Sequence, residues 1–144
     1  MSVKNVADLV GVRVLYVEDN ADIRALVSAF LGTDGAGATV VAVPSADEAV
    51  AAFDRVRPDV LVSDGEMPER DGWELIAQIR TWPGERGGRI PAIAVTGASS
   101  ETDRLRSRES GFDAHISKPI HMDELVRAIA KLVGREVRWD GAPD

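Results

Sequence analysis

The sequence contains no cysteine among its 144 residues. This absence excludes a disulfide-stabilised scaffold and thiol chemistry, and it fits the reducing cytoplasm. Long apolar runs are also missing, because no stretch approaches the roughly 20 apolar residues that cross a bilayer. The N-terminal stretch MSVKNVADLVG holds one lysine and no long apolar segment, which is not the pattern of a secretory signal. We therefore expect a cytoplasmic protein with no membrane insertion.

Basic charge is scarce as well. The chain has 17 Lys and Arg residues against 24 Asp and Glu residues, which gives a net charge of −7. Its arginines are scattered among carboxylates, whereas a nucleic-acid surface needs concentrated basic side chains. We therefore expect no direct contact with nucleic acid. The hydrophobic content of 44% is ample for one buried core in a chain of this length.

Short runs of apolar and β-branched residues recur along the chain, and segments with helical spacing lie between them. The runs predict strands at residues 12–17, 38–43, 59–63, 90–95 and 114–117. Strands that alternate with helices predict βαβ units, right-handed crossovers and a parallel sheet covered on both faces. We expect one domain at residues 11–134, with a lead-in at 1–10 and a tail or linker stub at 135–144.

Two of the expected helices have contrasting patterns. The first carries an apolar stripe of Ile23, Leu26, Val27, Phe30 and Leu31. Residues 99–111 are charged, and Leu105 is the only large apolar side chain among them. We therefore expect the second of these helices to make little contact with the core. Ser45 and the pair Ser99-Ser100 stand where residues that cap helices stand.

Polar residues gather where the expected strands end. Ligands of open α/β sheets bind outside the carboxyl ends of the strands. Three carboxylates, a hydroxyl and an ammonium stand there, namely Glu18, Asp19, Asp64, Thr96 and Lys118. Each residue taken singly has an ordinary explanation as a helix cap, a turn hydroxyl or a solvated lysine. Their joint occurrence on successive strand ends favours a functional site.

The chemistry of this set suggests two ligands. Three neighbouring carboxylates repel one another unless a cation lies among them, and Mg²⁺ suits an oxygen site that also meets a phosphate. A lysine and a threonine would then serve as donors to phosphoryl oxygens.

Four pieces of the sequence together resemble the receiver domain of bacterial two-component response regulators. They are Glu18-Asp19, Asp64 with Met67-Pro68 and Gly72 behind it, Thr96-Gly97-Ala98, and Lys118-Pro119. The similarity runs from about residue 11 to residue 134. It implies a single-domain, flavodoxin-like (βα)5 fold with a five-stranded parallel sheet in the order 2-1-3-4-5.

The resemblance also implies roles for individual residues. By matching position, Asp64 is the phosphoacceptor and a metal ligand, and Lys118 and Thr96 contact the phosphoryl group beside Gly65 and Gly97. Asp19 is expected to bind Mg²⁺ directly, Glu18 through water, and Glu66 through its backbone carbonyl. The family's phosphodonor is a phosphohistidine on a histidine kinase or a histidine phosphotransfer domain. The domain is thus expected to be a signalling module and not an enzyme with a separate substrate.

The switch that the resemblance implies departs from the commonest pattern. Thr96 and His115 occupy the two switch positions, and His115 stands where the family often has Tyr or Phe. Glu66 and Ala98 border the path of the attacking water in the family, so the lifetime of the phosphorylated state stays open. The resemblance implies that a downstream effector binds through the helix at 100–111 and the strand at 114–117.

Three alternative interpretations compete with this one. A phosphatase of the haloacid dehalogenase type carries its D-x-D motif after the first strand, whereas Asp64-Gly65-Glu66 follows the third. A flavodoxin-like electron carrier would need a phosphate loop where Glu18 and Asp19 stand. A degenerate receiver would lack some of the site residues. The sequence leaves open whether the chain is a stand-alone regulator or comes from a hybrid histidine kinase.

Overall fold

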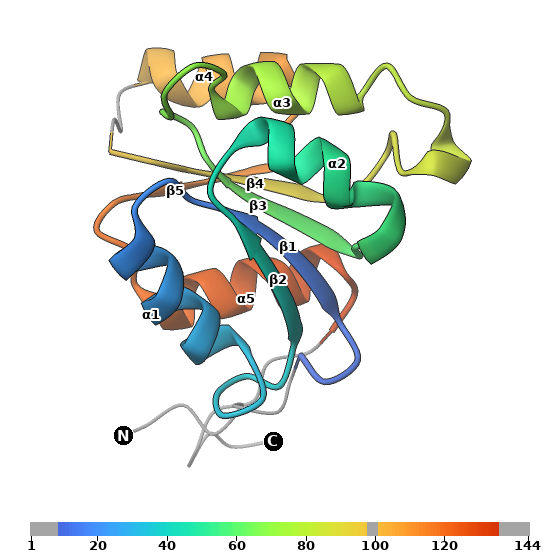
Figure 1. The fold of residues 1–144 in the computed structure, drawn as a ribbon. Coiled ribbons are helices and arrows are strands. Elements are labelled where there is room, and N and C mark those ends of the chain that lie inside the picture. Colours follow the sequence, from blue (N-terminus) through green and yellow to red (C-terminus); the bar gives the residue numbers. More distant parts are fainter. Residues whose placement is uncertain (1–8, 98–100, 136–144) are drawn as a thin grey trace.

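The computed structural model describes residues 9–97 and 101–135. In that part, strands and helices alternate along the chain (Figure 1). The strands are β1 (Arg13–Val17), β2 (Thr39–Val43), β3 (Val60–Asp64), β4 (Ala92–Thr96) and β5 (Ala114–Ser117). The helices are α1 (Ala21–Leu31), α2 (Ala46–Val56), α3 (Gly72–Ile79), the short 3₁₀ helix η1 (Gly84–Arg86), α4 (Glu101–Ser110) and α5 (Met122–Leu132).

All neighbouring strands pair in parallel, and the sheet has the order β2-β1-β3-β4-β5. Figure 1 shows α1 and α5 on one face of this sheet and α2, α3 and α4 on the other. The predicted fold, strand order and covering of both faces are therefore confirmed. The bounds of β5 are those expected, and the bounds of the other strands differ from the expected ones by one or two residues. The largest difference is in β4, which begins after Pro91 because proline has no N–H to donate to a ladder.

The core is divided by the sheet into two clusters. Side chains alternate along a strand, so Val14 and Tyr16 of β1 pack toward α1 and α5. Leu15 and Val17 pack toward the opposite face, where Trp73 of α3 lies. Both faces of β1, β3 and β4 are therefore buried, which explains why their sequences are apolar without alternation.

The apolar stripe expected on α1 is only partly correct. Val27 and Leu31 are buried, but Leu26 is 71% exposed and Phe30 is 45% exposed. Residues 23, 27 and 31 lie one helical turn apart and face the sheet, whereas residues 26 and 30 lie about 100° around the helix. Helical spacing alone does not distinguish these two adjacent rows.

Helix α4 has little contact with the core, as its charged sequence predicts. Ser107 is its buried residue, and Leu105 is 50% exposed. The expected cap at Ser99-Ser100 lies outside the described residues. The cap at Ser45 is confirmed, because its side chain accepts a hydrogen bond from the backbone N–H of Glu48.

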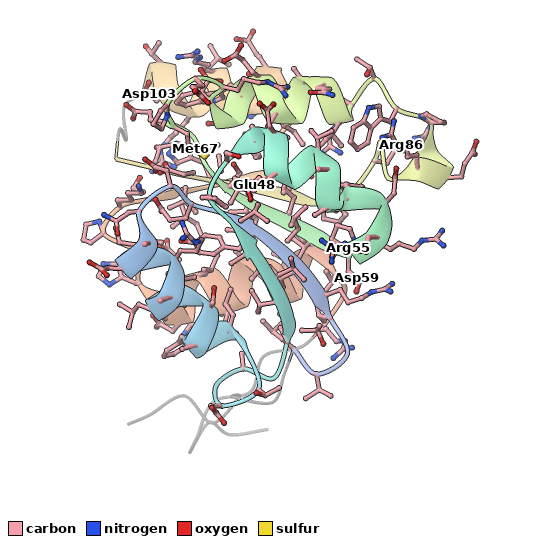
Figure 2. The ribbon with its side chains drawn as sticks, in the orientation of Figure 1. Glu48, Arg55, Asp59, Met67, Arg86 and Asp103 are labelled. Atoms are coloured by element: carbon pink, nitrogen blue, oxygen red, sulfur yellow. The ribbon has the colours of Figure 1, made fainter. Side chains whose placement is uncertain are left out.

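Different side chains lie at the two ends of the strands. Figure 2 shows Met67 near the C-terminal ends of the strands, whereas Arg55, Asp59 and Arg86 lie toward their N-terminal ends.

Within the described residues, no helix has the length and apolar character needed to cross a bilayer. Residues 1–8 and 136–144, which make up most of the expected lead-in and tail, lie outside the described part.

Candidate functional site

Three carboxylates meet at the C-terminal ends of the strands. Glu18 and Asp19 follow β1, and Asp64 is the last residue of β3. One oxygen from each side chain can be chosen so that all lie within 4.8 Å of one another. Glu18 and Asp64 are only 2% and 3% exposed, whereas Asp19 faces solvent. The sequence-based expectation that these side chains converge is therefore correct.

Backbone groups fix the two buried carboxylates. The N–H of Asn20 donates to Oε2 of Glu18 at 3.0 Å, and the N–H of Glu66 donates to Oδ1 of Asp64 at 3.3 Å. Arg24, which reaches back from α1, donates to the carbonyl oxygen of Glu18 at 2.8 Å. Arg24 was not singled out in the sequence, because one arginine on an expected helix carries no signal of this contact.

Lys118 joins the cluster from the loop after β5. Its Nζ atom lies 3.0 Å from Oδ2 of Asp64 and 3.8 Å from Oε1 of Glu18. Burial acts to lower the pKa of Lys118, but the hydrogen bond to Asp64 and the nearby carboxylates outweigh it and raise that pKa. The ammonium is therefore held in its charged form beside Asp64.

One lysine leaves excess negative charge in this cluster. Burial raises the pKa of Glu18, and repulsion from Asp64 adds to the increase, against the opposing effects of the Asn20 N–H and Lys118. A buried carboxyl group with a raised pKa stands to gain from a nearby cation. Carboxylate oxygens are also the donors that hard divalent ions prefer. The residues present therefore fit a magnesium ion.

Glycines allow close packing around Asp64. A Cβ atom on Gly65 would lie 2.6 Å from Cγ2 of Thr96 and 2.9 Å from Cζ2 of Trp73. A Cβ atom on Gly72 would lie 2.2 Å from the carbonyl oxygen of Asp64. A side chain at position 65 would therefore crowd Asp64, and the absence of one at position 72 lets α3 begin directly against β3.

Thr96, the last residue of β4, lies next to His115 of the neighbouring strand β5. Thr96 is fully buried, and its Oγ1 atom lies 3.1 Å from Nε2 of His115. The other ring nitrogen, Nδ1, lies 3.2 Å from Oγ of Ser107 in α4. Gly97 follows Thr96, and a Cβ atom there would meet no atom of the described residues within 4 Å. Ala98 lies outside the described residues.

The sequence does not predict that Ser107 and Trp73 are partners of this pair. Trp73 Nε1 donates to Ser107 Oγ at 3.1 Å, which connects α3 to α4. The signal in the sequence is weak, because Ser107 is one of several uncharged residues on this charged helix and its register against the sheet cannot be deduced from the sequence. His115 therefore has bonded neighbours on both sides of its ring.

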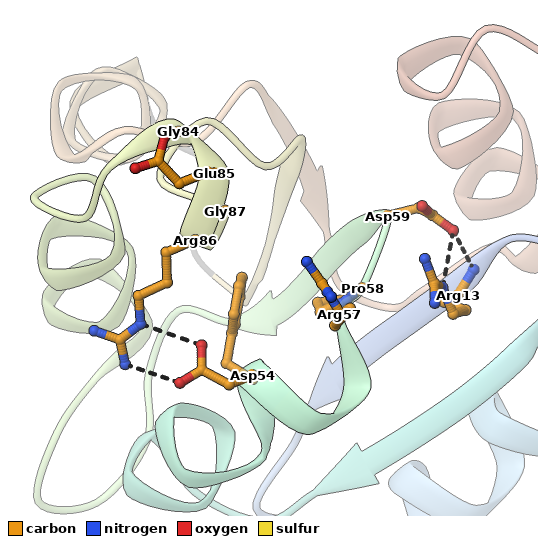
Figure 3. Close-up of a pocket in the computed structure, with 10 residues that line it drawn as sticks. Arg13, Asp54, Arg57, Pro58, Asp59, Gly84, Glu85, Arg86 and Gly87 are labelled. Carbon is orange, nitrogen blue, oxygen red and sulfur yellow. Dashed lines mark hydrogen bonds and ion pairs between the residues drawn. The ribbon is translucent and has the colours of Figure 1, made fainter.

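A hollow of about 590 Å³ lies at the opposite end of the sheet and is not part of this site (Figure 3). It borders the start of β1, the end of α2 and η1. Arg86 pairs with Asp54 at 3.2 Å on one side, and Arg13 pairs with Asp59 at 3.7 Å on the other. Figure 3 shows Arg57 between these pairs. Because arginines and carboxylates are matched around it, the hollow has no evident charge preference.

Comparison with known proteins identifies the family. Residues 14–130 match the sequence profile described as the response regulator receiver domain. The chain belongs to this family. It is thus a receiver domain of two-component signal transduction, a signalling domain related to those of response regulators and histidine kinases.

Relatives of this receiver domain occur in chains of different lengths. An uncharacterized 14.6 kDa protein of Leptolyngbya boryana is 41% identical over 116 residues, which cover 81% of this chain and 86% of that protein. The transcriptional regulatory protein TrcR of Mycobacterium tuberculosis is 35% identical over 138 residues, which cover 96% of this chain. This chain thus spans only 51% of the length of TrcR.

One similar solved structure contains a magnesium ion. It is the receiver domain of the sensor histidine kinase PA1611 from Pseudomonas aeruginosa, with a TM-score of 0.76 and 30% sequence identity. The similarity covers 86% of this chain and 98% of that domain. That protein was solved with a magnesium ion coordinated in its active site cleft.

Proposed function

We propose that Asp64 accepts a phosphoryl group from a phosphohistidine, carried by a histidine kinase or a histidine phosphotransfer domain. The observation that carries this proposal is the position of Asp64. Its carboxylate ends a buried strand, lies among two other carboxylates and faces the ammonium of Lys118 at 3.0 Å. A rigid base with charged neighbours suits a nucleophile that must meet phosphorus in line.

The reaction would replace one bond to phosphorus by another. An oxygen of Asp64 attacks phosphorus, the bond from phosphorus to the donor imidazole nitrogen breaks, and that nitrogen keeps the electron pair. Lys118 offsets negative charge on the equatorial oxygens, and Thr96 donates a hydrogen bond to one of them. The product is an acyl phosphate, which hydrolyses readily and thus limits the duration of the signal.

The carboxylates around Asp64 would hold a magnesium ion, which supplies positive charge to the phosphoryl oxygens when bound. Asp19 is the proposed direct ligand together with Asp64, while Glu18 acts through water and Glu66 through its backbone carbonyl. The magnesium in the PA1611 domain and the fit of the carboxylates here support this assignment.

The same proposal extends to the regulatory partners. Residues 11–134 form the receiver unit, and α4 with β5 forms the surface that a downstream effector reads. Thr96 and His115 connect that surface to the phosphoryl group, with Gly65 and Gly97 beside it. The loose attachment of α4 to the core supports its use as a switch element.

The proposal is tested by phosphorylation with a small donor. The protein is incubated with acetyl phosphate and Mg²⁺, and the added phosphoryl mass is localised by mass spectrometry after rapid quenching. We expect labelling of Asp64 that EDTA prevents, that Asp64→Asn lacks and that hydroxylamine removes. Labelling of the Asp64→Asn variant at the wild-type level, or a product stable to hydroxylamine, would show the assignment to be wrong.

A further inference from the structure

Four side chains form one hydrogen-bonded chain that leads to the candidate site. Trp73 Nε1 lies 3.1 Å from Ser107 Oγ, Ser107 Oγ lies 3.2 Å from His115 Nδ1, and His115 Nε2 lies 3.1 Å from Thr96 Oγ1. These residues come from α3, α4, β5 and β4. Trp73, Ser107 and Thr96 are 5%, 1% and 0% exposed. His115 between them is only partly buried and borders a hollow of about 180 Å³ on the surface.

We propose that Trp73 and Ser107 are positioning residues that, through His115, orient the hydroxyl of Thr96 toward the phosphoryl group. The proposal rests on the function proposed above. It concerns the direction in which hydrogen bonds are donated along the chain, and this direction can be derived from the chemistry of its two ends.

The indole end of the chain has a fixed polarity. An indole N–H can donate a hydrogen bond but cannot accept one. Ser107 Oγ is therefore an acceptor toward Trp73. The indole is also held in place, because the Arg106 guanidinium lies 4.1 Å above its ring centre and the backbone of Gly65 packs against its edge. Ser107 thus receives a donor from a group that has little freedom to turn away.

The direction of the remaining hydrogen bonds follows from this first one. Because Ser107 accepts from Trp73, its single hydrogen is available to His115 Nδ1. A neutral imidazole that accepts at Nδ1 carries its proton on Nε2. Nε2 then donates to Thr96 Oγ1, and the threonine hydrogen can be donated to a phosphoryl oxygen. Every bond runs from Trp73 toward the proposed phosphorylation site.

The opposite polarity would be incompatible with this role. A helical serine can instead donate to the carbonyl oxygen four residues earlier. His115 would then donate from Nδ1 to Ser107, and its Nε2 atom would accept the hydrogen of Thr96. The threonine would present a lone pair, and not a hydrogen, to an anionic phosphoryl oxygen. The two polarities therefore differ in the tautomer of one imidazole ring.

The first experiment determines this tautomer by ¹⁵N NMR of the imidazole nitrogens. The sequence has two histidines, so His121→Asn leaves His115 as the only imidazole in the spectrum. This substitution should not disturb the fold, because the His121 side chain precedes α5 and makes no capping hydrogen bond. Spectra are recorded at about pH 8.5, two units above the ordinary imidazole value. We expect the proton on Nε2, and a mixture of tautomers in the additional variant Ser107→Ala. A proton on Nδ1 in the parent would overturn the proposal.

The second experiment measures whether Ser107 acts through Thr96. Beryllofluoride is titrated as a phosphoryl mimic in saturating Mg²⁺ and followed by NMR. We expect Ser107→Ala to weaken beryllofluoride binding about fivefold, the effect of a poorly oriented hydrogen bond. Mg²⁺ affinity should be unchanged, because Ser107 is bonded to none of the carboxylates. Ser110→Ala, a change of the same type on the same helix, is the matched control.

A double-mutant cycle separates positioning from a general loss of structure. If Ser107 acts through the Thr96 hydroxyl, Ser107→Ala should have no further effect in the Thr96→Ala background. An undiminished fivefold loss in that background would overturn the proposal. The tautomer experiment uses no phosphate, so a protein with the Nε2 proton that takes no phosphoryl group would disprove the proposed function and leave the polarity of the chain established.

Discussion

The ammonium of Lys118 is hydrogen-bonded to Asp64 at 3.0 Å, although 54 residues separate the two in sequence. The parallel sheet brings them together, because β3 and β5 end at the same edge on either side of β4. Lys118 therefore neutralises part of the charge of the carboxylate cluster, and the stability of the protein should depend on that pair.

Replacement of Lys118 by methionine tests this dependence. Asp64 is nearly buried and would lose its charged partner. We expect Lys118→Met to lower the free energy of unfolding by about 1–3 kcal/mol in EDTA, the cost of an unsatisfied buried group. Millimolar Mg²⁺ should recover much of the loss, since it supplies a cation at the same carboxylates. Urea unfolding measures both values, and the exposed Lys131→Met should change them by less than about 0.5 kcal/mol.

Binding of Mg²⁺ should stabilise the fold and require Asp19. An ion that binds only the native protein adds about 2.7 kcal/mol when its concentration is a hundredfold above the dissociation constant. We expect the wild-type melting temperature to rise on addition of Mg²⁺. Asp19→Asn should raise the stability in EDTA, because one repulsive charge is removed, and should abolish the response to the ion. Equal wild-type melting temperatures in EDTA and in Mg²⁺ would argue against a shared metal site.

The convergence of these residues could be predicted from the sequence, and the physical reason is simple. Five β-branched runs separated by helical segments define a parallel sheet, and a parallel sheet collects its strand ends at one edge. The sequence therefore predicts that Glu18, Asp64 and Lys118 lie close together. Burial on both faces of β3 also followed from its uninterrupted apolar sequence.

Contacts that depend on the rotation or register of a helix could not be predicted. Leu26 and Val27 are adjacent and equally apolar, and only the angle at which α1 lies on the sheet exposes one and buries the other. The bond from Ser107 to His115 likewise depends on how α4 is set against β5. The charged sequence of α4 contains no apolar stripe from which this register could be calculated.

Ionisation of Glu18 should make stability depend on pH when no metal is bound. Its pKa is raised from 4.5, with burial as the largest cause. A carboxyl group with a raised native pKa favours the folded state while it is protonated, and this contribution is lost as the pH rises through that pKa. We therefore expect the free energy of unfolding in EDTA to fall as the pH increases from about 4.5.

The variant Glu18→Gln isolates this contribution. It cannot ionise, so the part of the decline that belongs to Glu18 should disappear, and the variant should be the more stable protein at neutral pH. Unfolding by urea at a series of pH values in EDTA gives both curves. Parallel curves for wild type and variant would show that another group causes the decline.

A methyl group at position 65 should disturb the site directly. It would lie 2.6 Å from the methyl of Thr96 and 2.9 Å from the ring of Trp73. Both neighbours are buried, so we expect Gly65→Ala to cost about 1–3 kcal/mol of stability through overpacking and to slow labelling by acetyl phosphate. Gly84→Ala is the matched control, because no atom lies within 4 Å of its built Cβ position. Equal urea midpoints for the two variants would contradict the steric argument.

Removal of the Thr96 hydroxyl should separate phosphoryl binding from its structural effect. Asp64, Lys118 and the other carboxylates remain in Thr96→Ala, so the variant should still bind beryllofluoride with Mg²⁺, about tenfold more weakly for the loss of one hydrogen bond to a charged group. The effect of Thr96→Ala on α4 and β5 should be larger than its effect on beryllofluoride binding. Thr96 is bonded to His115, which is bonded in turn to Ser107, the buried residue of α4.

The readout is amide hydrogen exchange in α4 and β5 with beryllofluoride at saturation for each variant. In the wild type, we expect binding to change exchange in both elements, because an element that is held by few apolar contacts opens at low free-energy cost. In Thr96→Ala most of that change should be lost, while Thr81→Ala, which removes an exposed hydroxyl bonded to Gln78 in α3, should respond as the wild type does. A full wild-type response in Thr96→Ala would mean that the phosphoryl group reaches α4 by a route that does not pass through His115.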